Sequence, residues 1–534
     1  MISMPTLKIN DQEVTVEQGT TVLKAAAETG VEIPTFCYHP GLSAPANCRM
    51  CLVEIDGGRG PQLMPACYTQ AGEGMDVKTD SPTTKDAQKS VLEFILLNHP
   101  VDCPICDQAG ECTLQDHYFD YSAQPSRLRH TKVHKPKVKV LGPNIVLDAE
   151  RCILCTRCVR FCDEVTETHE LRVTQRGDHS EITTFPGLDL DNKYSLCTAD
   201  ICPVGALTSR GFRFKARVWN NKRTKSVCDQ CARNCSTFVD TLRNDVKRVS
   251  PRTNEEVNSW WACDEGRTAF KKYQEGRYLK GVISHEGTTN ELAPSDSYHR
   301  LGSQLSQTVE AHGGEAVGIL IHPSWSNEDI FVAAQFAMEA GFSLYVGGRA
   351  TDGYEDNILI RGDKNANRYG MNLILEAMGV KHGGVDSLAA AIEAGTIRTL
   401  LILDGEHALP ESVITSIGQV EKVIALAAWQ TPILDAAHVI APTRLVYERG
   451  GTFVNFEGHI QRFHKTQMHD VNILSPWHAL STIARAGGWD MQYDRISDVF
   501  AGMAEMVPRF AGLAYQELPD DGVTTVQAAS TGAV

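Results

Sequence analysis

The sequence predicts a chain of several domains, mixed α+β in its first half and α/β in its second half. The chain has 534 residues, more than one hydrophobic core normally serves. All 17 cysteines lie at or before Cys263, and most of them fall into four closely spaced sets. After about residue 273, apolar runs alternate with helical stretches, which is typical of a parallel sheet covered on both faces.

The first domain is predicted to open with two strands and a helix. Alternating apolar and polar residues indicate strands at Thr6–Ile9 and Glu13–Val16, and helical spacing indicates a helix over residues 21–29. A loop that contains three cysteines follows this helix. A second, amphipathic helix is expected over residues 84–98.

The second half is predicted to form the parallel sheet. Its apolar runs and helical stretches have the lengths of buried strands and of the helices that connect them. The expected strands are Ala316–Ile321, Ser343–Val346, Thr399–Leu403, Lys422–Ala427 and His438–Ala441, with helices at Asp329–Ala340 and Ser387–Ala394. The end of the chain is rich in Ser, Thr, Gly and Ala, so residues 513–534 are expected to be a flexible tail.

Composition excludes several classes of function. The formal net charge of -15 argues against general nucleic-acid binding. We expect neither a membrane span nor a secretory signal, because we find no run of 18 apolar residues and no basic start. Clustered cysteines in a large chain of this kind indicate a reducing compartment, with thiols that bind metal. Two basic runs, 127–139 and 210–225, fit a solvated face slightly better than a seam against an acidic partner or a counter-charge for metal sites.

The first cysteine set is Cys37, Cys48, Cys51 and Cys67, with the spacing C-x10-C-x2-C-x15-C. A long loop with three cysteines and a distant fourth is typical of a plant-type [2Fe–2S] centre, although its first gap is longer than in plant ferredoxins. A zinc knuckle is the alternative. The strand–strand–helix context favours the ferredoxin fold.

The second set is His99, Cys103, Cys106 and Cys112. One His and three Cys could bind zinc, so a zinc site remains an alternative on ligand type alone. His99 lies at the end of a predicted helix and shortly before three thiols, which favours a ligand role. In an iron–sulfur cluster, a neutral imidazole in place of a thiolate should raise the midpoint potential.

The third set is Cys152, Cys155, Cys158 and Cys202, the last followed by proline. Together with Cys162 the first three give the run C-x2-C-x2-C-x3-C of two-cluster bacterial ferredoxins. The four members of the set are therefore predicted to hold one [4Fe–4S] cluster.

The second cluster of such a ferredoxin is predicted to be lost. Cys162 would need three further cysteines, but those positions hold Asn192, Ser195 and Thr198. Cys197 lies one position out of register. Cys162 and Cys197 are therefore expected to be small buried residues rather than ligands.

The fourth set is Cys228, Cys231, Cys235 and Cys263, with the spacing C-x2-C-x3-C-x27-C. Four thiolates with these gaps could bind zinc equally well. The three neighbouring sets favour a further [4Fe–4S] cluster.

These motifs, in this order, resemble the large iron–sulfur subunit of respiratory complex I, the NADH–quinone oxidoreductase. The stretches that carry the resemblance are 36–40 (FCYHP), 47–54 (NCRMCLVE), 98–107 (NHPVDCPICD), 157–161 (RCVRF) and 202–209 (CPVGALTS). The resemblance implies a [2Fe–2S] centre at the first set and [4Fe–4S] centres at the other three. The fourth centre is one that only some members have.

The second half resembles a molybdopterin-oxidoreductase domain through residues 363–370 and 448–461. Since no cysteine follows Cys263 and this half is short for two pterin sites, we expect a fold retained without that cofactor. The expected domains are 1–83 ([2Fe–2S] ferredoxin-like), 84–145 (His-ligated [4Fe–4S]), 146–215 (ferredoxin-like [4Fe–4S]), 216–272 ([4Fe–4S] of molybdopterin-oxidoreductase type) and 273–512 (degenerate molybdopterin-oxidoreductase-like).

The resemblance implies an electron-relay subunit that carries single electrons rather than hydride. It would take electrons from a flavin-bearing, NADH-oxidising partner and pass them through downstream iron–sulfur subunits toward quinone. It would lie on the cytoplasmic face of the inner membrane and touch the membrane only through its partners. The alternatives are a molybdenum-dependent, NAD-linked formate dehydrogenase, a subunit of an NAD-linked hydrogenase, and a multi-zinc interaction protein.

Overall fold

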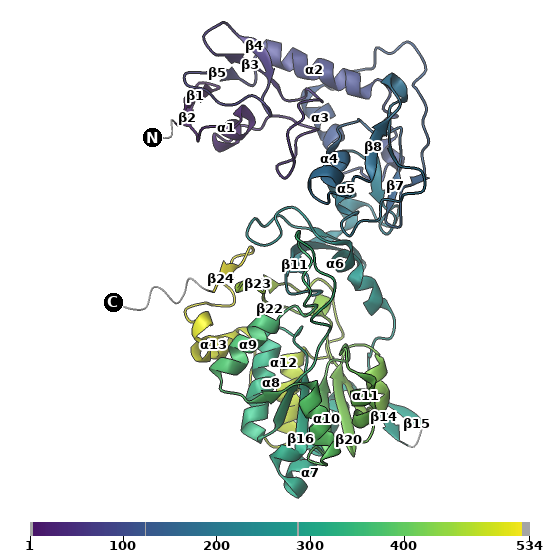
Figure 1. The fold of residues 1–534 in the computed structure, drawn as a ribbon, viewed down its shortest axis with the longest axis vertical. Helices are drawn as coiled ribbons and strands as arrows, with labels where there is room; N and C mark the ends of the chain where they lie inside the picture. The colour runs from purple at the N-terminus through teal and green to yellow at the C-terminus, as the bar shows by residue number, and fades with distance from the viewer. Residues whose placement is uncertain (1–3, 123, 286–287, 526–534) are drawn as a thin grey trace, which may run out of the picture. The chain divides into compact units, whose positions relative to one another are not determined.

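The computed structural model describes residues 4–122, 124–285 and 288–525 (Figure 1). The chain forms two compact units, Met1–Asn221 and Lys222–Val534, which we call the N-terminal and C-terminal units. None of the helices in the described ranges combines the length and apolar character that a bilayer span requires.

The N-terminal unit opens with the expected strands and helix. Five strands form a sheet in the order β2-β1-β5-β3-β4, and β1 pairs with β5 in parallel. The second strand begins one residue earlier than predicted. Helix α1 buries Val22, Ala25 and Ala26, and the Thr21 side chain caps it by accepting a hydrogen bond from the Lys24 backbone. The bounds are β1 Thr6–Ile9, β2 Gln12–Thr15, α1 Val22–Glu28, β3 Leu52–Asp56, β4 Gln62–Pro65 and β5 Asp76–Lys78.

The rest of this unit consists of short helices and small sheets. The expected amphipathic helix is α2, which begins two residues earlier than predicted because Ser81 caps it and Pro82 occupies its first turn. Two antiparallel sheets have the orders β10-β7-β6 and β8-β9. The bounds are α2 Pro82–Leu96, α3 Thr113–Tyr121, β6 Lys139–Val140, β7 Ile145–Leu147, α4 Arg157–Glu164, β8 Leu171–Thr174, β9 Glu181–Thr184, α5 Cys197–Asp200 and β10 Leu207–Ser209.

The C-terminal unit contains the expected parallel sheet. Its eight strands have the order β15-β14-β21-β20-β19-β16-β17-β18, and all pairs from β21 to β18 are parallel. The antiparallel hairpin β14–β15 at one edge was not predicted. The bounds are β14 Gly281–His285, β15 Thr288–Leu292, β16 Val317–Ile321, β17 Ser343–Val346, β18 His382–Gly383, β19 Thr399–Leu403, β20 Lys422–Ala427 and β21 Val439–Pro442.

Helices and two further three-stranded sheets complete this unit. The sheets have the orders β11-β12-β13 and β22-β23-β24. Helix α12 packs against α7 and α8. The bounds are β11 Lys222–Val227, β12 Ser236–Leu242, β13 Asp245–Pro251, α6 Asp264–Thr268, α7 Pro294–His312, α8 Asn327–Ala340, α9 Arg368–Ala377, α10 Val385–Glu393, α11 Glu411–Ile417, β22 Gly451–Val454, β23 His459–Phe463, α12 Pro476–Ala486, α13 Ile496–Met506 and β24 Val523–Thr524.

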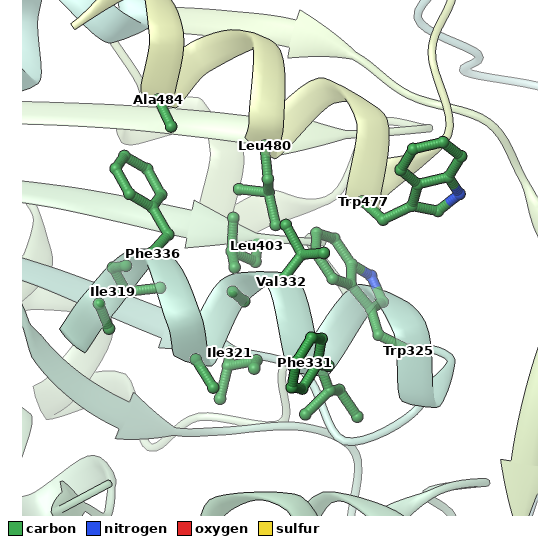
Figure 2. Packing of buried hydrophobic residues seen from close by; sticks show 14 of the residues in the cluster. Ile319, Ile321, Trp325, Phe331, Val332, Phe336, Leu403, Trp477, Leu480 and Ala484 are labelled. Carbon is green, nitrogen blue, oxygen red and sulfur yellow. The ribbon is translucent and has the colours of Figure 1, made fainter. Parts of the chain in front are cut away.

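The parallel sheet is buried on both faces, as predicted. Alternate residues of one strand enter different cores: Ile319 and Ile321 join the core under α8 and α12, whereas Leu320 joins the core under α10 and α11. In Figure 2, the first core is formed by side chains from β16, β19, α8 and α12, among them Ile319, Leu403, Val332, Phe336 and Leu480.

A buried polar group holds the start of α8. Ser326 and Asp329 form a capping box, and Asp329 makes a buried ion pair with Arg449. Glu328 accepts hydrogen bonds from the backbone N–H of Thr452 at 3.0 Å and from its hydroxyl at 2.8 Å. Burial raises the pKa of Glu328 to about 7.

Polar side chains also gather at the carboxyl ends of β16, β17 and β19. Strand order reverses between β16 and β19, and this edge is where doubly wound folds bind their ligands. Here Trp325 donates a hydrogen bond to Asp404 at 3.2 Å, and the Gly348 backbone donates to His407 at 2.8 Å. Arg349 pairs with Glu406 at 2.6 Å. The chain's own side chains therefore bridge this edge.

The segment expected to be a flexible tail is packed as far as Thr525, which corrects that expectation for residues 513–525. Leu518 and Thr525 are buried, and β24 pairs with β23. Arg252 forms an ion pair with Asp521. The remainder of the expected tail, 526–534, lies outside the described residues.

Candidate iron–sulfur sites

The four residues of the first set come together beside the five-stranded sheet. Cys37 and Cys48 lie in the loop after α1, Cys51 directly precedes β3, and Cys67 follows β4. The Cys37 backbone N–H donates to the Cys48 sulfur at 3.4 Å. Hydrogen bonds from the Cys48 and Cys67 thiols hold the pKa of Cys37 well below its usual range. The loop therefore stabilises a thiolate, the form that binds metal.

The second set lies between α2 and α3. His99 follows α2, and Cys112 directly precedes α3. Burial lowers the pKa of His99 to about 4, so its ring is neutral at pH 7. The His99 Nδ1 atom is buried and accepts or donates no hydrogen bond within the described residues. An orphaned ring nitrogen beside Cys103 and Cys112, which line the same cavity, fits a metal ligand.

The third set lines one small apolar cavity. Cys152, Cys155 and Cys158 come from the loop that leads into α4 and from its first turn, and Cys202 comes from the residues after α5. Burial raises the pKa of Cys152 to about 12 and that of Cys155 to about 11. Thiols buried in this way lose their protons when a metal takes the protons' place, so the cavity fits a cluster.

The positions of the lost ferredoxin site hold hydrogen-bonded polar side chains. The backbone N–H and the side-chain amide of Asn192 both donate to the Glu170 carboxylate. The Thr198 hydroxyl donates to the Ser195 carbonyl at 2.7 Å. Cys162 is buried nearby, and burial raises its pKa to about 12. This arrangement fits the prediction that Cys162 binds no metal.

The fourth set lies in the C-terminal unit and also lines one cavity. All four of its cysteines contribute to the lining. The Cys228 backbone donates to the Cys235 carbonyl at 2.9 Å, and the Cys263 sulfur accepts a hydrogen bond from the Gly266 backbone at 3.4 Å. A Cβ atom on Gly266 would lie 2.8 Å from the Cys228 sulfur, so only glycine leaves room for the thiolate and its ligand there.

Each set has a non-glycine residue in the left-handed region within two positions of a predicted ligand. Such conformations cost energy and concentrate at functional sites, and a β-branched residue such as Val101 adopts them rarely. Sequence reasoning missed this signal, because none of these residues is Gly. The residues are Ala46, Arg49, Val101, Leu154, Thr156 and Asn234, with φ between 52° and 62°.

The third site lies between the first and the second within the N-terminal unit. The Cys112 sulfur lies 3.8 Å from the carbonyl oxygen of Pro203, the residue after Cys202. A Cβ atom on Gly205 would lie 2.3 Å from the Cys106 sulfur. On the other side, α4, which carries Cys158, contacts the loop of the first site.

Basic side chains surround the second site. Arg217 donates to the Cys106 carbonyl at 2.6 Å, and Lys132 donates to the His99 carbonyl at 2.5 Å. Lys137 pairs with Asp102 at 3.2 Å and with Glu150 at 2.5 Å. These contacts favour the interpretation of the basic runs as counter-charges for metal sites over a simple solvated face.

Across the residues that the structure describes, no three His, Cys, Asp or Glu side chains converge on a point where one ion would bind. The ligands of an iron–sulfur cluster bind separate iron atoms, so they need not converge on one point.

Three family models match the first part of the chain. They are a 2Fe-2S iron-sulfur cluster binding domain at residues 3–82, the NADH-ubiquinone oxidoreductase-G iron-sulfur binding region at 88–127, and the NADH-quinone oxidoreductase subunit 3 ferredoxin-like domain at 142–208. The chain is therefore a mixed α/β multidomain protein with 2Fe–2S and 4Fe–4S ferredoxin-like domains.

Curated relatives carry one name, that of the G-type subunit of NADH-quinone oxidoreductase. The relative from Rickettsia bellii is 43% identical over 339 residues, 64% of this chain and 49% of the relative. A relative from Rhizobium meliloti is 39% identical over 60% of this chain and 37% of its own length. This chain thus spans about half the length of the first of these relatives.

A solved structure, described as an NAD+-reducing [NiFe]-hydrogenase in the H2-reduced state, is 27% identical, with a TM-score of 0.37. It covers 40% of this chain and 92% of its own. The relatives and the family models confirm the resemblance inferred from the motifs: over the matched part, the chain is homologous to the G-type subunit of NADH-quinone oxidoreductase.

Proposed function

We propose that this chain is an electron-relay subunit of an NADH–quinone oxidoreductase. It holds one [2Fe–2S] cluster at the first set and one [4Fe–4S] cluster at each of the other three. The ligands are Cys37, Cys48, Cys51 and Cys67; His99, Cys103, Cys106 and Cys112; Cys152, Cys155, Cys158 and Cys202; and Cys228, Cys231, Cys235 and Cys263.

One observation carries the proposal: residues with ligand spacing gather into buried sites, three of them inside the stretches matched by iron–sulfur family models. At the second set, the buried His99 Nδ1 atom has no hydrogen-bond partner in the described chain, which supports a ligand role for the ring. At the third set, four sulfurs line one cavity.

Iron–sulfur clusters supply reversible transfer of single electrons. The chain's part is to hold and shield them. Apolar side chains such as Leu147 and Val204 exclude water from the third site, and Arg217 and Lys132 bring positive charge to the second. Because the third site adjoins both others in the N-terminal unit, the order first–third–second gives the shortest steps between neighbours.

The C-terminal unit serves as a docking and shielding scaffold without molybdopterin. No cysteine follows Cys263, and the ligand-binding edge of its sheet is bridged by Asp404, His407 and Arg349. The partners are a flavin-bearing, NADH-oxidising subunit and downstream iron–sulfur subunits. These partners hold the chain at the cytoplasmic face of the inner membrane as a peripheral component.

The test is the metal and sulfide content of the full chain purified without oxygen. We expect about 14 iron atoms and as many acid-labile sulfides per chain, with paramagnetic signals that appear during stepwise reduction. Stoichiometric zinc with only traces of iron would end the relay proposal in favour of a zinc protein. Stoichiometric molybdenum would instead support a catalytic molybdenum subunit.

A further inference from the structure

Helix α4 has two faces with different tasks. Cys158, Phe161 and Cys162 are buried on one face, and Cys158 lines the third site. Arg157, Arg160 and Glu164 are spaced three and four positions apart, so the helix presents them together. These three charged side chains all belong to the helix that carries a third-site ligand, yet Arg160 and Glu164 reach a different site.

Arg160 and Glu164 hold the loop of the first site. Arg160 donates hydrogen bonds to the carbonyl oxygens of Cys37 and Ser43. The Glu164 carboxylate accepts from the Ser43 backbone at 2.8 Å and from its hydroxyl at 2.5 Å. The loop that carries two first-site ligands is thereby fastened to α4.

Arg157 spans both sites with one guanidinium group. One nitrogen, Nη2, donates to the Tyr38 carbonyl at 2.5 Å, and the other, Nη1, donates to the Ile201 carbonyl at 3.1 Å. Tyr38 directly follows the first-site ligand Cys37, and Ile201 directly precedes the third-site ligand Cys202. The third donor of the group, Nε, is buried and has no hydrogen-bond partner within the described residues.

The charge of Arg157 is also uncompensated. In the part of the chain that the structure describes, no carboxylate lies within ion-pair distance of it, whereas Arg151 and Arg449, for example, pair with Asp148 and Asp329. A partly buried charge with no ion pair acts over several ångströms, because the protein interior screens it less than water does.

We propose that Arg157 is a positioning residue whose positive charge is shared by the first and third centres and raises the midpoint potential of both. This inference rests on the proposed function. Reduction adds negative charge to a cluster, and a nearby cation stabilises the reduced form. A cation between two centres moves both potentials in the same direction, so it strengthens electron uptake by the pair while the difference between the two potentials changes little.

The experiment uses the full chain, loaded with iron and sulfide without oxygen. The variants are Arg157→Met, which removes the charge, and Arg157→Lys, which keeps it. Arg160→Met is the matched control, since Arg160 donates to carbonyls of the first-site loop and to none near the third site. Redox titration followed by electron paramagnetic resonance gives the midpoint potential of each centre.

We expect Arg157→Met to lower both potentials, Arg157→Lys to lower them less, and Arg160→Met to move the first centre more than the third. Assembled clusters whose potentials stay unchanged in Arg157→Met, or of which one alone moves, would overturn the inference. Equal shifts in Arg157→Lys and Arg157→Met would show that the charge is not the cause.

If Arg157→Met does not fold, Arg157→Lys decides the same question. Potentials close to those of the wild type in this variant support the inference, because the charge is kept, and a large drop refutes it. Wild-type protein without clusters would refute the proposed function itself.

Discussion

Replacing Gly205 with Ala should eliminate the second cluster and spare the other three. A Cβ atom at this position would lie 2.3 Å from the Cys106 sulfur, 3.1 Å from Gln108 Cβ and 3.6 Å from Arg151 Cδ. Carbon and sulfur normally stay about 3.5–4 Å apart. The two segments must therefore separate by more than about 1 Å, far beyond the ~0.2 Å tolerance of a metal ligand.

The expected magnitude has two parts. Overpacking of this kind costs about 1–3 kcal/mol in the free energy of unfolding. Loss of one [4Fe–4S] cluster lowers the iron content from about 14 to about 10 atoms per chain. The assays are iron and sulfide analysis, thermal unfolding, and electron paramagnetic resonance of the remaining centres.

The matched control is Gly57→Ala, because a Cβ atom on Gly57 meets no atom within 4 Å. That variant should keep its full iron content and stability. Gly205→Ala with a full iron content and an unchanged signal from the second centre would refute the reasoning, because Cys106 would then not be the ligand that the methyl group displaces.

Three further predictions concern single side chains. His99→Cys should keep a cluster but lower its midpoint potential, because a thiolate adds negative charge; a redox titration in which the potential is unchanged or raised contradicts His99 as a ligand. Cys202→Ser should reduce the iron bound at the third site, whereas Cys162→Ser should not; a loss of iron in Cys162→Ser means different ligation. The folded-state pKa of Glu328, about 7, lies above its ordinary 4.5, so the folded state binds the proton more tightly. Its contribution to stability is complete below pH ~4.5 and is lost as pH rises through ~7, a change of about 3 kcal/mol; Glu328→Gln should remove this component from the pH dependence of chemical unfolding, and an unaltered dependence speaks against a buried, proton-binding Glu328.

The sequence predicted the parallel strands because buried strands are apolar along their whole length. The run Thr399–Leu403, for example, coincides with β19 and is fully buried. The edge hairpin escaped prediction because β15, Thr288–Leu292, is mostly exposed and carries no apolar pattern. Strand β24 escaped for a related reason: it pairs with β23 through its backbone, which composition does not reveal.

The sequence also predicted which side chains gather at each site, because metal ligands follow characteristic spacings. It could not predict what surrounds them. The bond from Arg157 to the Tyr38 carbonyl joins residues 119 positions apart, and no local pattern encodes such a contact. The left-handed conformations of Val101 and Thr156 were equally hidden, since neither residue type favours them.

The bridged edge of the parallel sheet has a consequence for how the protein matures in a cell. A fold completed by a bound organic molecule is only as stable as the supply of that molecule allows. Here Asp404, His407 and Arg349 meet their partners within the chain, and translation delivers those partners together with the strands they join. The C-terminal unit can thus finish its sheet independently of any cofactor biosynthesis, leaving cluster insertion as the step at which cellular iron limits production.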